Sequence, residues 1–194
     1  CIEAENDNYF CNENYSLEVV HASLGSPLEG PYRSGEELHF RYTVSNWHPT
    51  KCNWIQGIVP DFMVGWDTKS FDADGELRVK VKSPEAYSDG KWDWYKAGEA
   101  HYNLENPVKG YEKGKETSPG WYFMENSVEE LDSSRGDGAL CDDIHYFEWV
   151  VEFKARLTPY PHCTPDSLYY AILQIMTLSD GEIGNRDMAA CLTD

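Results

Sequence analysis

Two short acidic turns carry the residue types best suited to hold a metal ion. In the first, DADGE, the carboxylates of Asp72, Asp74 and Glu76 stand at alternating positions around a glycine bend, as in the first half of a calcium loop. The EF-hand pattern is not completed, because its twelfth position lacks the bidentate acid and no flanking helices are predicted. The second turn, SDGEIGNRD, supplies three further acids, Asp180, Glu182 and Asp187. Calcium is the cofactor that these turns would take, and none is required for the fold; an ordinary solvated turn is the simpler explanation of each.

Six cysteines favour covalent cross-links over metal ligands. They are Cys1, Cys11, Cys52, Cys141, Cys163 and Cys191, with no CxxC pair and no Cys/His cluster of zinc-finger spacing. An even number of widely spaced cysteines predicts three disulfides and therefore an extracellular location, either secreted or on a cell surface. We expect Cys163 to pair with Cys191 around the last strand region. Elimination then leaves Cys52 with Cys141 and Cys1 with Cys11, and other connectivities remain open.

No catalytic motif stands out, and the chain is predicted to be non-enzymatic. The sequence contains no GxSxG, HExxH, Walker loop or GxGxxG, and its six histidines show no metal-ligand spacing. A glycosidase needs only two carboxylates, which 34 acidic residues could supply anywhere, so the absence of a motif is weak evidence. The tripeptide RGD, Arg135 to Asp137, matches an integrin-binding sequence, but a solvated turn in a polar loop explains it better.

Composition describes a folded and strongly acidic protein. Of 194 residues, 41% are hydrophobic and 14% aromatic, which excludes a disordered chain. Acidic residues outnumber basic ones by 34 to 16, giving a formal net charge of -18. This field repels phosphate backbones and anionic membrane surfaces, so nucleic acid and bilayers are poor partners. The most apolar run, LYYAILQIMTL, is too short to cross a bilayer as a helix, and no transmembrane segment is predicted.

Apolar residues alternate with polar ones along several short segments, which is typical of half-buried strands. In ELHFRYTVSNW the inward residues are Leu38, Phe40, Tyr42 and Val44, and in HYFEWVVEFKARL they are Phe147, Trp149, Val151 and Phe153. Gly, Pro and Asp turns separate about seven such segments, without βαβ alternation. We therefore predict an all-β antiparallel sandwich, immunoglobulin-like or jelly-roll-like, with long loops. It would span residues 17–194, after a linker or disulfide-tied arm at residues 1–16.

The stretch CNWIQGIVPDFMVGWD, from Cys52 to Asp67, organises the rest of the chain. Its apolar residues follow neither a helical nor a two-residue period, which predicts a long loop laid across the open end of the sandwich. Trp54 and Trp66 would pack inward as core cover, an interpretation that we favour over a ligand groove. Further on, Trp92 and Trp94 would anchor a weakly patterned middle region, as a short strand or as a loop crossing the sheet.

Three other segments complete the predicted elements. In ELRVKVK, Leu77, Val79 and Val81 would face inward, and the exposed lysines between them suit an edge strand. The nearly continuous apolar run LYYAILQIMTL suggests a central strand covered on both faces. The short segment VEELDSS, residues 128–134, is the best helix candidate.

Parts of the sequence resemble known extracellular modules. SLEVVHASLGSPLEGPYRSGEELHFRYTVSNW resembles the first strands of bacterial extracellular immunoglobulin-like repeats. CNWIQGIVPDFMVGWD, GWYF and SDGEIG together resemble a module of large secreted surface proteins of Bacteroidota, exported by the type IX system and associated with gliding or adhesion. The C-terminal secretion signal of such proteins is not evident, so the chain would be an internal or trimmed module.

This resemblance implies a surface building block and transfers no catalytic residue. We therefore predict a non-enzymatic structural or adhesive module of a cell-surface or secreted assembly. Its partners would be neighbouring modules, copies of itself or glycans. The alternative is a carbohydrate-binding module that uses surface Trp and Tyr: an exposed line of Trp and Tyr on one sheet face would favour binding, and complete burial of all seven tryptophans would favour a scaffold.

Overall fold

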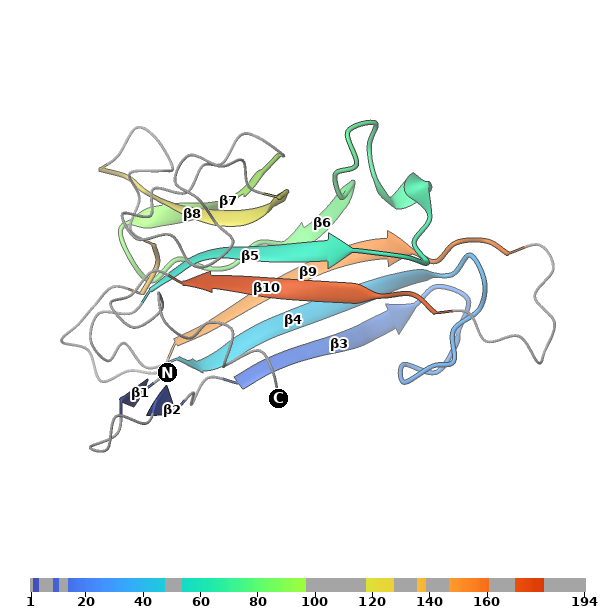
Figure 1. Ribbon diagram of the computed structural model, residues 1–194, viewed down its shortest axis with the longest axis horizontal. Coiled ribbons are helices and arrows are strands. Elements are labelled where there is room, and N and C mark those ends of the chain that lie inside the picture. Colours follow the sequence, from blue (N-terminus) through green and yellow to red (C-terminus); the bar gives the residue numbers. More distant parts are fainter. Residues whose placement is uncertain are drawn as a thin grey trace.

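Two antiparallel four-stranded sheets pack together and form a β-sandwich (Figure 1). The computed structural model describes residues 2–3, 9–10, 14–47, 54–96, 118–127, 136–138, 147–160 and 170–179. Within these residues the secondary structure is nearly all β-strand, with one short 3-10 helix, η2 (Thr68–Ser70). The predicted all-β antiparallel sandwich is therefore confirmed.

Sheet 1 has the strand order β3-β4-β9-β6. Its strands are β3 (Asn14–Ala22), β4 (Glu37–Trp47), β9 (Phe147–Arg156) and β6 (Val79–Lys82). The register pairs Phe40 with Phe153 and Tyr42 with Val151, so the alternating apolar residues of β4 and β9 share one face. These side chains are buried, as the sequence alternation predicted.

Sheet 2 has the strand order β10-β5-β8-β7. Its strands are β10 (Leu173–Ser179), β5 (Ile55–Phe62), β8 (Gly120–Glu125) and β7 (Gly90–Tyr95). Figure 1 shows β5 and β10 running in front of β9 and β4 of sheet 1. A separate pair, β1 (Ile2–Glu3) and β2 (Tyr9–Phe10), lies beside the N-terminus in the same view.

Most of the stretch from Cys52 to Asp67 is a strand, so the loop prediction was wrong. Residues 55–62 form β5, which pairs with β10 on one side and with β8 on the other. Ile58 belongs to the core between the sheets. Its neighbour Val59 points to the opposite face of the sheet and is buried as well. A strand buried on both faces shows no polar alternation, and this is why the pattern did not indicate one.

Gly57 allows a tyrosine ring to lie close to the middle of β5. A Cβ atom at this position would stand 2.9 Å from Cδ1 of Tyr122 and 3.0 Å from Cδ1 of Leu178. Glycine is therefore required here for close packing, although it weakens a strand in general.

Strand β6 is an edge strand, as predicted, but its side chains face the opposite way. Leu77 is buried, whereas Val79 and Val81 are exposed, and Lys80 is the residue that pairs with the core residue Phe153. The chain bends between Leu77 and β6, and this bend shifts the alternation by one residue. An inward lysine on an edge strand discourages pairing with the edge of another chain.

Strand β10 also differs from its prediction. Within the described residues it pairs only with β5, so it is an edge strand of sheet 2 and not a central one. Residues 170–172 of the apolar run lie outside any strand, and Tyr170 and Ile172 are exposed there. Near the end of β10, Oγ1 of Thr177 lies 2.8 Å from the hydroxyl oxygen of Tyr42, and this buried hydrogen bond joins the two sheets.

Some predicted features lie outside the described residues. These are all six cysteines with their disulfides, the acidic turn at residues 180–187 and the helix candidate at residues 128–134. Strand β3 begins at Asn14, so the sandwich starts slightly before the predicted boundary at Leu17. Among the residues that the structure does describe, no helix is long and apolar enough to cross a membrane.

Candidate functional site

The carboxylate of Asp137 is 0% exposed and accepts hydrogen bonds from several parts of the chain. Its Oδ2 atom accepts hydrogen bonds from the indole Nε1 of Trp92 at 2.8 Å and of Trp149 at 2.7 Å. Its Oδ1 atom accepts three backbone N–H bonds, from Tyr87, Ser88 and Gly138, at 2.7 to 2.9 Å. Five donors therefore satisfy this buried carboxylate.

These bonds connect the two sheets at one point. Trp92 belongs to β7 of sheet 2, and Trp149 belongs to β9 of sheet 1. The backbone of Asp137 also exchanges two hydrogen bonds with Ile55 of β5, at 2.9 and 2.8 Å. A buried charge is tolerated only when its hydrogen bonds are complete. We call Asp137 with the two indoles the Asp137 pin, and its role is structural.

The pin corrects the interpretation of the RGD tripeptide. The sequence predicted a solvated turn, yet Gly136, Asp137 and Gly138 are all buried. An integrin-type contact needs an accessible aspartate, and this one is enclosed by its own donors. The side chain of Asp137 is therefore not open to an integrin-type contact in this fold.

A second buried carboxylate, Glu36, organises the loop between β3 and β4. It is 0% exposed, and it accepts backbone N–H bonds from Leu24 at 2.8 Å, Ser26 at 3.3 Å and Arg33 at 2.9 Å. Burial by itself raises the pKa of this carboxyl group, but the hydrogen bonds from Ser26, Arg33 and Leu24 outweigh it and lower the pKa to about 2. Glu36 is thus a loop anchor that stays charged at ordinary pH.

We expect Glu36 to make the fold sensitive to acid. Its folded pKa lies below the unfolded one, so its stabilisation is present above about pH 4.5 and is lost as the pH falls towards 2. Glu36→Gln should lower the free energy of unfolding by roughly 1 to 3 kcal/mol at pH 7, because an amide cannot accept all of these bonds. Urea unfolding of both proteins between pH 7 and pH 2 measures this difference, which should shrink in acid.

The exposed Glu29 of the same loop provides the matched control, and Glu29→Gln should have the stability of the parent at every pH. A constant difference between Glu36→Gln and the parent across this pH range would contradict the assigned role of Glu36.

One cleft of about 500 Å³ opens beside the end of β5, between β7 and the segment that follows β5. Its apolar wall includes Phe62, Phe71 and Leu77, together with Trp94 of β7. Polar groups come from Asp61, Thr68, Asp72 and Ser118. We call this site the Trp94 cleft. Its volume and its mixture of an apolar wall with few polar groups are typical of small-ligand sites.

Lys80 covers the tryptophan of this cleft. Its Nζ atom lies 4.3 Å from the centroid of the Trp94 ring, a cation–π contact across the open edge between β6 and β7. Burial lowers the pKa of Lys80, and the carboxylates of Glu76 and Asp72 oppose this shift. The lysine that β6 turns inward is thus held by aromatic and acidic neighbours.

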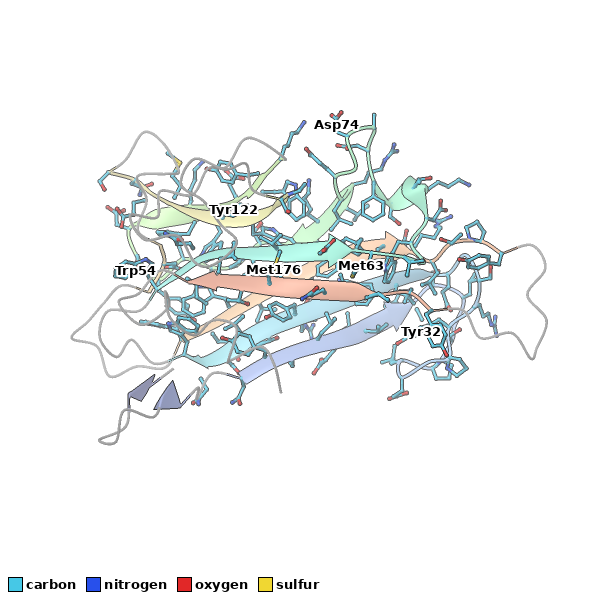
Figure 2. The ribbon with its side chains drawn as sticks, in the orientation of Figure 1. Tyr32, Trp54, Met63, Asp74, Tyr122 and Met176 are labelled. Carbon is cyan, nitrogen blue, oxygen red and sulfur yellow. The ribbon has the colours of Figure 1, made fainter. Side chains whose placement is uncertain are left out.

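The first acidic turn borders the cleft but does not gather its carboxylates. Oδ1 of Asp72 accepts the backbone N–H groups of Asp74 at 3.0 Å and of Glu76 at 2.9 Å, and these bonds lower the Asp72 pKa. Asp74 extends from the outer tip of the turn (Figure 2), whereas Glu76 is buried. Within the described part of the chain, no group of three or more His, Cys, Asp or Glu side chains could hold a metal ion. Calcium binding at this turn stays a prediction.

None of the seven tryptophans is exposed. Trp47, Trp92, Trp121 and Trp149 are buried, and Trp54, Trp66 and Trp94 are half-buried. Trp66 packs against the core as predicted: its ring meets Phe40 edge to face at 5.6 Å, and its Nε1 donates to the Ile172 carbonyl at 2.9 Å. Trp54 stands at the start of β5 (Figure 2), against the backbone of Gly136. The sandwich therefore presents no flat platform of exposed tryptophans.

Sequence reasoning missed the central residues of both sites. Asp137 was noticed only as part of a tripeptide, and the cleft residues Asp61, Phe62 and Phe71 were not singled out. The available signal was an aspartate between two glycines, in a chain whose indole N–H groups need buried acceptors. The chain matches no family model, and comparisons with curated proteins and with solved structures likewise found no match.

Proposed function

We propose that this chain is a non-enzymatic structural module of a cell-surface or secreted assembly, as in the Bacteroidota surface proteins that its sequence resembles. The observation that carries the proposal is the use of the tryptophans. All seven are at least half-buried, and two of them join the sheets through Asp137. Aromatic side chains that a binding platform would expose instead stabilise the body of the sandwich.

Charge and cysteine content agree with such a role. A net charge of -18 keeps closely packed copies soluble, and it makes their lateral contacts depend on salt or divalent cations. The three predicted disulfides would suit an oxidising, extracellular location. The partners would be neighbouring modules or further copies of the chain.

Single-molecule force spectroscopy tests this proposal. The chain is placed between marker domains of known unfolding force and stretched from its two ends. We expect one cooperative rupture per copy, because the pin and the shared core join the sheets, and we expect a lower rupture force for Asp137→Asn.

Extension in several weak steps below the force of the markers would contradict the structural role. Turnover of any substrate in a panel of glycans and peptides would contradict the non-enzymatic assignment. A fusion of the marker domains alone supplies the reference force trace.

A further inference from the structure

We propose that the Trp94 cleft binds a neutral saccharide. The inference goes beyond the structural role and does not depend on it. The cleft has a volume of about 500 Å³, which lies within the roughly 300 to 1,000 Å³ of small-ligand sites. This space suits one or a few sugar rings, and it differs from the exposed aromatic platform that the sequence suggested.

The apolar wall of the cleft suits the C–H faces of a sugar ring. Phe62 and Phe71 contribute aromatic surface and are fixed edge to face with ring centroids 5.1 Å apart, and Trp94 adds the part of its ring that Lys80 does not cover. The Trp94 ring is likewise held edge to face against Trp121, at 4.8 Å. Rings fixed in this way lose little conformational freedom when a ligand packs against them.

The polar groups of the cleft exclude two classes of ligand. Two carboxylates, Asp61 and Asp72, line it, and none of the described lining residues is a lysine or an arginine. An anion would meet these carboxylates, and the nearby ammonium groups of Lys80 and Lys96 only balance that charge, so an anion gains no net attraction. A wholly apolar ligand would remove water from the carboxylates and give no hydrogen bonds in return. The ligand must therefore donate hydrogen bonds.

The charges beside the cleft do not favour a cationic ligand. Lys80 lies over the Trp94 ring, and both Lys80 and Lys96 are near enough to Asp72 to help lower its pKa. These two ammonium groups balance the two carboxylates, so a cationic ligand gains no net attraction either. Hydroxyl groups can donate to Asp61 without adding charge. The hydroxyls of Thr68 and Ser118 can donate to ring and hydroxyl oxygens.

Isothermal titration with three trisaccharides tests the proposal: neutral cellotriose or maltotriose, anionic trigalacturonate, and cationic chitosan trimer. NMR follows the indole N–H of Trp94 at the same time. We expect a neutral sugar to bind saturably and to shift this resonance. Asp61→Asn should weaken binding at least tenfold, about 1.4 kcal/mol, with an unchanged melting temperature because Asp61 is exposed.

Asp93→Asn is the matched control. Asp93 lies beside Trp94 on β7, but it is exposed outside the cleft, and its Oδ2 accepts from Nζ of Lys91 at 3.0 Å. This variant should bind as the parent does. The proposal fails if no neutral sugar binds, if only a charged trimer binds, or if Asp61→Asn and Asp93→Asn bind alike. Each of these results leaves the force measurement, and hence the structural role, unaffected.

Discussion

Replacing Asp137 by alanine should lower the free energy of unfolding by roughly 3 to 5 kcal/mol. The substitution removes the acceptor of five hydrogen bonds and leaves the indole N–H groups of Trp92 and Trp149 buried without a partner. Asp137→Asn keeps the side-chain volume but places an amide donor against N–H donors. Most of the loss should therefore persist in this variant. Urea unfolding followed by tryptophan fluorescence measures both values.

The control is Glu85, which lies just before Tyr87 and Ser88, the residues whose backbone N–H groups bind Asp137. Glu85 itself is exposed. Glu85→Ala should unfold within about 0.5 kcal/mol of the parent. If Asp137→Asn were as stable as the parent, the carboxylate would not be needed, and the pin would be only a close contact.

The second large effect is expected at Phe153, which lies at the centre of the aromatic core. Its side chain is 0% exposed, and its ring centroid lies 5.3 Å from that of Phe40, 5.8 Å from Phe62 and 5.9 Å from Trp121. Phe153→Ala should cost roughly 3 to 5 kcal/mol, because it creates a cavity where both sheets contribute rings. Equilibrium denaturation checks the value.

Phe153→Leu distinguishes the effect of the cavity from the effect of losing the aromatic ring. It should be considerably more stable than Phe153→Ala, because leucine restores most of the side-chain volume. The exposed Val79 of the neighbouring strand β6 is the control position, since Val79→Ala removes no core contact. Equal losses at Phe153 and Val79 would show that the core is not centred where the structure places it.

The sequence predicted strands best where one face meets the core and the other meets water. Strands β4 and β9 show this alternation because sheet 1 has a polar outer face, where Arg41 pairs with Glu152 and His39 lies beside the same carboxylate. Strand β5 lacks it because both of its faces are buried, and Gly57 and Pro60 lower its apparent strand preference further. In β6 the bend after Leu77 exchanged the inward and outward side chains, and the alternation of apolar and polar residues in the sequence does not reveal such a local bend.

The candidate sites were less predictable because their parts lie far apart in the sequence. Trp92 and Tyr87 reach Asp137 across 45 and 50 residues. The Trp94 cleft joins the end of β5, the segment after it, β7 and the residues before β8. Only the fold brings these segments together. Trp66, by contrast, was correctly expected to pack on the core, since a large aromatic residue in an apolar stretch is usually buried.

Hydrogen exchange at the indole N–H groups tests most directly whether the Asp137 pin holds the two sheets as one body. NMR in deuterated water follows Nε1–H of Trp92 and Trp149 alongside the backbone amides of β9. The pin predicts that both indole protons exchange only through global unfolding, as slowly as the most protected amides of β9. Exchange of either indole proton within minutes, while the amides of β9 stay protected, would contradict it.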